Sequence, residues 1–189
     1  MKQENGAAVV LAAGSSQRFG TDKRMANVDG QPMFVSSLKP YLAERLPVYV
    51  TLRPDDPVRE VLPNGVQVIE APDARFGMGH SLATAAETLS DESWILIGLA
   101  DMPWIRKETI AQIVACIRTL NNAIVRPTYR GQSGHPVGFT ASFLEELKQL
   151  TGDVGARDVV NRNRDKVVDL PVRDEAILRD VDTPKQLQV

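Results

Sequence analysis

The segment Ala7-Ala-Val-Val-Leu-Ala-Ala-Gly14, continued by Ser15-Ser-Gln-Arg-Phe-Gly20, is the most informative part of this chain. Its first half is a short, continuous apolar run that ends at a glycine, which is typical of a strand buried on both faces of a parallel sheet. Its second half is rich in glycine and serine, and backbone amides in such a turn can converge on phosphate oxygens. Arg18 and Lys23 add positive charge nearby. The stretch therefore predicts a strand followed by an anion-binding loop.

Two well-known phosphate loops do not fit this segment. No Gly-Lys-Ser/Thr follows, so the spacing is not that of a Walker loop, and the absence of Gly-x-Gly-x-x-Gly disfavours a dinucleotide-binding fold. From the residues alone, an alternative remains open. The loop could be only a tight strand-to-helix connection whose two cations, Arg18 and Lys23, are solvated.

Apolar strands and amphipathic helices alternate through most of the chain, which predicts a three-layer α/β fold with a mostly parallel sheet. The segment Pro136–Phe139 is expected to be an edge or antiparallel strand, because proline is tolerated there. We expect a single domain over residues 1–189. The other expected strands are 48–52, 66–70, 94–100, 123–125, 166–170 and 176–179, and the expected helices are 32–45, 57–62, 79–89, 107–120, 142–150 and 154–161.

Composition limits the partners and the compartment. A formal net charge of −2 without a long basic run argues against a nucleic-acid partner. The single cysteine, Cys116, excludes a disulfide framework and a cysteine-rich metal site. The first residues do not form a signal peptide, and no segment reaches the roughly 20 apolar residues of a membrane helix. We therefore expect a soluble, cytoplasmic protein without a membrane partner.

Acidic residues at two places suggest a metal site. Asp101 ends the most hydrophobic strand, at the edge of the sheet where ligands bind, and a carboxylate there can hold a hard cation such as Mg²⁺. The alternative for Asp101 is a helix cap. Asp180 and Asp182 alternate by two, which places both on one face of a strand. The alternative for this pair is a polar end before a terminal helix capped by Thr183-Pro184.

Three further positions have both a functional and a structural interpretation. Ser81 opens a predicted helix and could be its N-terminal cap. A lone histidine is usually structural or a surface residue, but His135 lies between two chain-breaking residues and therefore sits in a shaped loop. In the loop from Gly152 to Arg157, Arg157 could bind a substrate phosphate, while Asp153 could simply cap the helix that follows.

Six ordered motifs carry a resemblance to a known family. The chain resembles sugar-nucleotide-type nucleotidyltransferases and, more narrowly, the molybdenum cofactor branch of MobA/MocA-like proteins. This resemblance implies a three-layer Rossmann-like fold whose mostly parallel sheet contains one antiparallel strand. The resemblance spans nearly the whole chain. The motifs are Leu11-Ala-Ala-Gly-x-Ser-x-Arg-Phe-Gly20-x-x-Lys23, Gly77-Met-Gly-His-Ser-Leu82, Leu99-Ala-Asp-Met-Pro103, Gly134-His-Pro-Val137, Gly152-Asp-Val-Gly-Ala-Arg157 and Asp180-Val-Asp-Thr-Pro184.

The resemblance implies roles for individual residues. The implied catalytic residues are Arg18, Lys23 and Asp101. The implied metal ligands are Asp101 and a second carboxylate, for which Asp182 is favoured slightly over Asp180. The implied substrate-binding residues are Gly134, His135 and Arg157. The implied nucleotide-binding residues are Leu11, Ala12, Ala13, Gly14, Ser16, Arg18, Lys23 and Ser81.

The implied reaction is Mg²⁺-dependent transfer of CMP from CTP to molybdopterin, with release of pyrophosphate. Cytidylyltransferases of this branch carry Leu-Ala-Ala-Gly where guanylyltransferases carry Leu-Ala-Gly-Gly, and the methyl of Ala13 would narrow the space beside the base. Alternatives are GTP as donor, a sugar or polyol phosphate as acceptor, or a non-enzymatic cofactor carrier that serves a molybdoenzyme. One departure from similar proteins is Arg24-Met25, where aliphatic residues are usual, so we expect the exit of the loop to pack differently.

Overall fold

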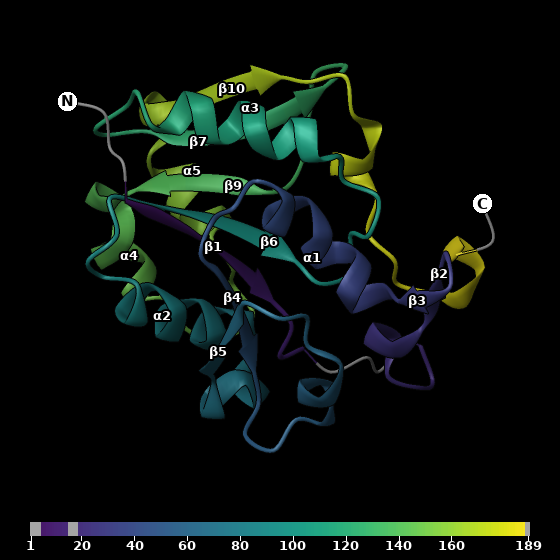
Figure 1. Cartoon of the computed structure of the whole chain (residues 1–189). Coiled ribbons are helices and arrows are strands. Elements are labelled where there is room, and N and C mark those ends of the chain that lie inside the picture. Colours follow the sequence, from purple (N-terminus) through teal and green to yellow (C-terminus); the bar gives the residue numbers. More distant parts are fainter. Residues whose placement is uncertain (1–4, 15–18, 188–189) are drawn as a thin grey trace.

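The computed structural model describes residues 5–14 and 19–187 and contains an eight-stranded sheet. Strands follow one another in the order β10-β7-β9-β6-β1-β4-β5, and the short β8 pairs with β7 (Figure 1). A separate two-stranded hairpin joins β2 and β3. The strands are β1 (Gly6–Leu11), β2 (Asn27–Val28), β3 (Gln31–Pro32), β4 (Val48–Leu52), β5 (Val66–Glu70), β6 (Trp94–Leu99), β7 (Ile124–Tyr129), β8 (Gln132–Ser133), β9 (Val137–Thr140) and β10 (Val167–Pro171).

The sheet is mostly parallel. Strand β1 pairs in parallel with β4 and β6, while β9 runs antiparallel between β6 and β7. The short β8 is a second antiparallel strand, paired only with β7. The antiparallel prediction for Pro136–Phe139 is therefore confirmed, but the strand is interior, not an edge. Pro136 comes immediately before β9, so its missing N–H interrupts no ladder.

Helices cover both faces of the sheet, as predicted. Helices α1 (Met33–Ala43) and α3 (Lys107–Ile117) contact each other, and α2 (Met78–Thr88) contacts α4 (Leu144–Lys148) beside α5 (Arg157–Arg162) (Figure 1). The shorter 3-10 turns are η1 (Lys23–Met25), η2 (Pro57–Val61), η3 (Pro72–Phe76), η4 (Ala141–Phe143), η5 (Arg164–Lys166), η6 (Glu175–Leu178) and η7 (Pro184–Leu187).

Strand β1 explains the three layers, because its side chains alternate between two cores. Ala8 and Val10 pack into the core under α1 and α3, whereas Ala7 and Val9 pack into the core under α2, α4 and α5. All four residues have no exposed surface. A continuous apolar run is what a strand buried on both faces requires.

The predicted strand at 176–179 is wrong. Residues Glu175–Leu178 form the 3-10 turn η6 instead. The side chain of Asp174 accepts a hydrogen bond from the backbone N–H of Ala176 and thereby starts this turn. The helix predicted to begin at Val154 begins only at Arg157, after a glycine-containing loop.

The segment after η6 returns to the carboxyl end of β6. Val181 is fully buried against Val28 and Met33, and its backbone N–H donates to the carbonyl of Asp101 at 2.9 Å. In Figure 1 this yellow segment lies beside the β2–β3 hairpin. The chain thus brings its late aspartates to Asp101 without forming the strand that the sequence predicts there. Among the described residues, no helix is long and apolar enough to cross a membrane.

Candidate active site

A cavity of about 920 Å³ opens at the carboxyl ends of β1 and β6. This edge of an open parallel sheet is where ligands usually bind. The wall combines the start of the glycine loop with acidic and basic side chains. Its lining residues are Leu11, Ala12, Ala13, Gly14, Phe19, Lys23, Arg24, Arg53, Ala74, Arg75, Gly77, Met78, Ser81, Leu99, Ala100, Asp101, Asp153, Asp180 and Asp182.

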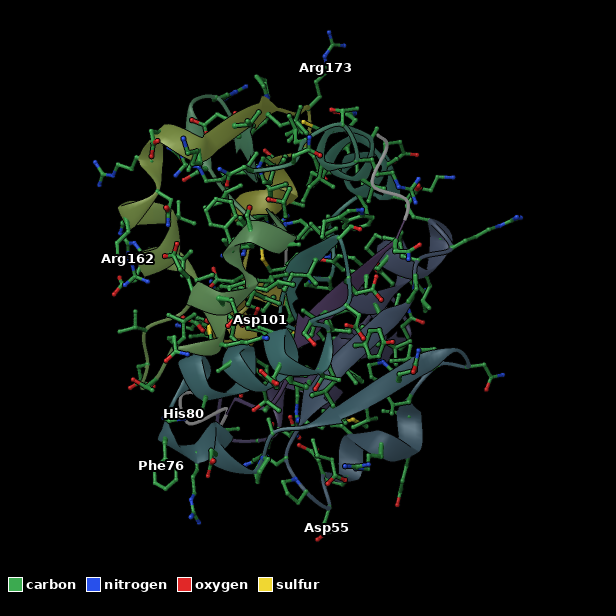
Figure 2. The ribbon with its side chains drawn as sticks, turned by 90° about the vertical axis from the view of Figure 1, so that its left-hand side faces the viewer. Asp55, Phe76, His80, Asp101, Arg162 and Arg173 are labelled. Atoms are coloured by element: carbon green, nitrogen blue, oxygen red, sulfur yellow. The ribbon has the colours of Figure 1, made fainter. Side chains whose placement is uncertain are left out.

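Three carboxylates meet in this cavity. Asp101, Asp180 and Asp182 each offer an oxygen, and these oxygens lie within 4.8 Å of one another. Asp101 follows the end of β6, while Asp180 and Asp182 flank the buried Val181. Figure 2 labels Asp101 towards the middle of the view, in contrast to Asp55 and Phe76, which project from the surface. Both aspartates that the sequence left as alternatives therefore lie in the same cluster.

Lys23 reaches into this carboxylate cluster from η1. Its Nζ lies 2.6 Å from Asp101 Oδ2 and 3.6 Å from Asp182 Oδ1, and it donates to the carbonyl of Val181 at 3.1 Å. The side chains of Lys23 and Asp101 are each 20% exposed, so the pair is accessible from the cavity. One ammonium faces three carboxylates, which leaves this group of four side chains with net negative charge.

The carboxylate cluster fits a hard divalent cation. Asp101 Oδ1 is buried and has no hydrogen-bond partner among the described residues, so none of these residues uses this ligand oxygen. Carboxylate oxygens are the ligands that Mg²⁺ and Mn²⁺ prefer. Asp101 does not cap α3. The carboxylate that binds the start of α3 is Asp174, which accepts from Arg106 N at 2.9 Å and from Thr109 Oγ1 at 2.7 Å.

The start of the glycine loop lies where the sequence predicts it. Leu11, Ala12, Ala13 and Gly14 all line the cavity. The backbone N–H of Ala12 donates to Thr51 Oγ1 on the neighbouring strand at 3.3 Å. The predicted contacts of Ser16 and Arg18 lie outside the described residues.

Ser81 is buried and lines the cavity, but it is not the cap of α2. The helix begins at Met78 with Gly77 as its N-cap, four positions before Ser81. Gly77 has φ 124°, and a Cβ there would lie 2.1 Å from the backbone carbon of Gly152. Glycine is therefore required at this position by backbone conformation and by close packing of two loops.

The predicted substrate-binding residues are not part of the cavity wall. A Cβ on Gly134 would lie 2.1 Å from the carbonyl oxygen of Ile177, so this glycine permits close packing. The backbone N–H of His135 donates to the same carbonyl at 3.0 Å. Arg157 is exposed at the first turn of α5, whereas Asp153 lines the cavity. The N-cap of α5 is Ala156, so Asp153 does not cap that helix.

His135 lies behind the carboxylate cluster. Its Nδ1 is buried without a hydrogen-bond partner among the described residues. Burial lowers the pKa of His135, and the negative charges of Asp101 and Asp180 only partly oppose that shift. The ring is therefore held neutral near pH 7, close to the acids but not on the cavity wall.

Three arginines in the cavity wall were not predicted from the sequence. Arg53 and Arg75 lie on the side of β4 and η3. Arg24 is buried, with 3% of its surface exposed, and binds Asp22 and Asp56. The only signal in the sequence was that Arg24 replaces an expected aliphatic residue.

The family follows from a comparison with known domains. The model of the MobA-like NTP transferase domain matches residues 8–167. The chain belongs to this family. The resemblance stated from its motifs and the predicted Rossmann-like fold are thereby confirmed, and the cavity at the strand ends is the candidate active site of a MobA-like nucleotidyltransferase.

Individual relatives of this MobA-like transferase have different names. The purine catabolism protein PucB of Bacillus subtilis is 28% identical over 94% of this chain and 92% of its own length. A probable molybdenum cofactor guanylyltransferase of Synechococcus elongatus is 31% identical over 52% of each chain. The crystal structure of Rv0371c from Mycobacterium tuberculosis superposes with a TM-score of 0.84 at 26% identity, covering 100% of this chain and 97% of that one.

Proposed function

We propose that this protein transfers CMP from CTP to molybdopterin in a Mg²⁺-dependent reaction. The observation that carries the proposal is the meeting of the glycine loop, Lys23 and three carboxylates in one cavity. An oxygen of the acceptor phosphate attacks the α-phosphorus of the nucleotide, the bond between the α-phosphorus and the bridging oxygen breaks, and pyrophosphate leaves. No general base is needed, because a phosphate acceptor is already ionised near neutral pH.

The residues divide the electrostatic work. Asp101 and Asp182, together with Asp180, would hold Mg²⁺, whose contribution is to neutralise charge on the triphosphate. Lys23 supplies a mobile positive charge for the α-phosphate, and Arg18 is assigned to the departing phosphates. Positioning and charge neutralisation account for catalysis in such transfers. We assign Gly134, His135 and Arg157 to the acceptor side, although they lie outside the cavity wall; His135 would act there through the neighbouring carboxylates.

Ala13 supports CTP as the donor. It is buried and lines the cavity, so its methyl group occupies space that a glycine would leave for a larger base. GTP is the second candidate, favoured by the relative named guanylyltransferase. In either case the acceptor is molybdopterin, and transfer of the product to a molybdoenzyme would follow.

A nucleotide screen tests this proposal. The purified protein is incubated with Mg²⁺, molybdopterin and each of the four ribonucleoside triphosphates, and pyrophosphate release and product mass are measured. CTP is expected to be consumed in preference to the others. Preferential use of GTP would replace CTP by the second candidate. Pyrophosphate release with sugar or polyol phosphates instead would change the acceptor, and cofactor binding without any release would indicate a carrier.

Substitution of Ala13 tests the choice of base directly. Ala13→Gly is expected to raise the ratio of GTP to CTP use by about tenfold, since one methylene-sized change in a pocket is worth about 10- to 200-fold in discrimination. Ala8→Gly removes a methyl group from the same strand β1, where Ala8 packs into the core beneath α1 and α3 away from the cavity wall, and it serves as the matched control. Equal ratios in both variants would show that Ala13 does not read the base.

A further inference from the structure

Arg24 has a different environment from its neighbour Lys23. Both residues belong to η1, but the guanidinium of Arg24 turns inward to two carboxylates and a carbonyl. Its Nη1 donates to Ala12 O and to Asp56 Oδ2, each at 2.8 Å, and its Nη2 donates to Asp56 Oδ1 at 2.9 Å. Nη2 also donates to Asp22 Oδ2 at 2.6 Å, and Nε donates to Asp22 Oδ1 at 2.9 Å.

These bonds use all five N–H donors of the guanidinium. Arg24 is therefore already fully bonded, although it borders the cavity, and it has no donor left for a nucleotide. Burial raises the pKa of Asp56, but the hydrogen bonds from Arg24 and from the N–H of Val58, together with the positive charges of Arg24 and Arg53, outweigh this effect and hold that pKa below its usual value. The hydrogen bond to Arg24 also lowers the pKa of Asp22. Both acids are thus kept charged as partners of one cation.

The bonded groups belong to three separate segments of the cavity wall. Ala12 follows the end of β1 and begins the glycine loop. Asp22 caps η1 through the backbone N–H of Arg24, and Asp56 caps η2 through the N–H of Val58. One buried guanidinium therefore joins the glycine loop, the turn that carries Lys23, and the turn after β4.

We propose that Arg24 is a positioning residue for the transfer reaction. Its planar guanidinium holds the carbonyl of Ala12 and the turn η1 in fixed relative positions. It thereby determines where Lys23 Nζ lies relative to Asp101. The inference rests on the proposed nucleotidyl transfer. A lysine at position 24 would keep the charge but not the function, because an ammonium is a point charge and cannot bind two carboxylates and a carbonyl in fixed directions.

Separate measurements of stability and activity distinguish positioning from support of the fold. Arg24→Met removes the cation and leaves Asp56 charged and buried, so it is combined with Asp56→Asn, which keeps the acceptor oxygen for Val58. We expect the double variant to recover a urea midpoint near that of the wild type, because no unpaired buried charge remains. Its kcat/KM for the nucleotide is expected to stay about 10- to 100-fold lower, as small displacements of reacting groups cost this much.

Two further variants serve as controls for this experiment. Arg24→Lys keeps the positive charge beside Asp56 but not the planar fork, so it tests the positioning role even if the double variant fails to fold, and the same loss of kcat/KM is expected. Arg126→Met breaks an arginine–aspartate pair between β7 and β10, away from the cavity wall, and is expected to leave kcat/KM unchanged. Recovery of kcat/KM together with the urea midpoint in the double variant would overturn the proposal.

A readout without catalysis separates this inference from the proposed function. Reductive methylation with ¹³C-formaldehyde labels lysines, and the signal of Lys23 is identified by its loss in Lys23→Gln. In the double variant this signal is expected to move towards its position in Asp101→Asn, where the ion pair is broken. An unmoved signal would overturn the positioning role. A moved signal in a protein without transferase activity would leave that role standing and contradict the proposed function.

Discussion

Lys23 and Arg24 are adjacent in one 3-10 turn, yet they serve two acidic clusters of opposite character. The cluster around Lys23 is partly exposed, and one ammonium is shared among carboxylates that exceed it in charge. In the cluster around Arg24, the guanidinium and Asp56 are buried, and every donor of the guanidinium has an acceptor. The first can exchange a partner for an incoming cation or phosphate, whereas the second cannot do so without breaking the fold around it.

The contrast reflects the different chemistry of lysine and arginine. An ammonium on a flexible stem can follow a changing charge, while a planar guanidinium fixes the directions of its partners. A buried charge pair adds little net stability, but losing one member is costly. We therefore expect substitutions in the exposed cluster to affect activity first, and substitutions in the buried cluster to affect stability first.

The largest effect is expected from Asp101→Asn. Removing this charge should lower turnover by at least about 10³-fold, because metal-assisted charge neutralisation contributes several kcal/mol to such reactions. The fold, followed by circular dichroism, should be retained. Asp169→Asn, in the exposed pair with Arg126, is the matched control. Wild-type turnover in Asp101→Asn would remove Asp101 from the metal site.

The next effect concerns stability. Arg24→Met is expected to reduce the free energy of unfolding by about 3–5 kcal/mol, since it leaves the buried charge of Asp56 with only the longer ion pair to Arg53, at 3.6 Å. Urea denaturation measures this change. Arg126→Met should cost less than about 1 kcal/mol, as is usual for exposed pairs. A loss in Arg24→Met no larger than in this control would contradict the contrast between the clusters.

Acid pH provides a third test. The folded state lowers the pKa of Asp56, so it releases the proton more readily than the unfolded state does. The stability from this group is complete above the ordinary aspartate value of about 4, and it is lost as pH falls through the lower pKa of the folded state. Asp56→Asn should therefore show a shallower loss of urea midpoint between pH 5 and pH 3 than the wild type, whatever its stability at neutral pH. Parallel curves would count against this explanation.

The smallest change in stability is expected for Lys23→Met. Its ion pair is partly exposed, so the free energy of unfolding should change by less than about 1 kcal/mol. Removal of the cation also leaves no fully buried side chain unpaired, since the side chains of Asp101 and Asp182 are 20% and 36% exposed. Thermal and urea denaturation of the metal-free protein measure this. A loss comparable with that of Arg24→Met would mean that the two clusters do not differ as described.

The sequence predicted those parts of the site that depend on local pattern. The apolar run before Gly14 indicated β1, and Asp101 was found because it ends an apolar strand. The sequence predicted that Asp180 and Asp182 point the same way because they lie on one face of a strand. Both do lie in one cluster, but the described residues form no strand there. Their shared direction comes instead from Val181 between them, which is buried and hydrogen-bonded to Asp101.

Contacts between distant residues escaped prediction. Asp174 binds the backbone N–H of Arg106 at the start of α3 across 68 positions, and it also caps η6. Arg24 meets Asp56 across 32 positions. Neither pairing leaves a periodic signal, because each depends on how the strands order themselves in the sheet. The late segment and the buried guanidinium were therefore accessible only from the structure.

The hydrogen bond between Val181 and Asp101 has a consequence for biosynthesis. All strands of the described sheet end by Pro171, so a chain released before residue 180 would still contain every strand of the sheet. It would lack two of the three acids at the cavity and the residue that fastens them there. Such a product is expected to keep the sheet but to lack the assembled carboxylate cluster, so completion of the sheet during synthesis precedes completion of the candidate active site.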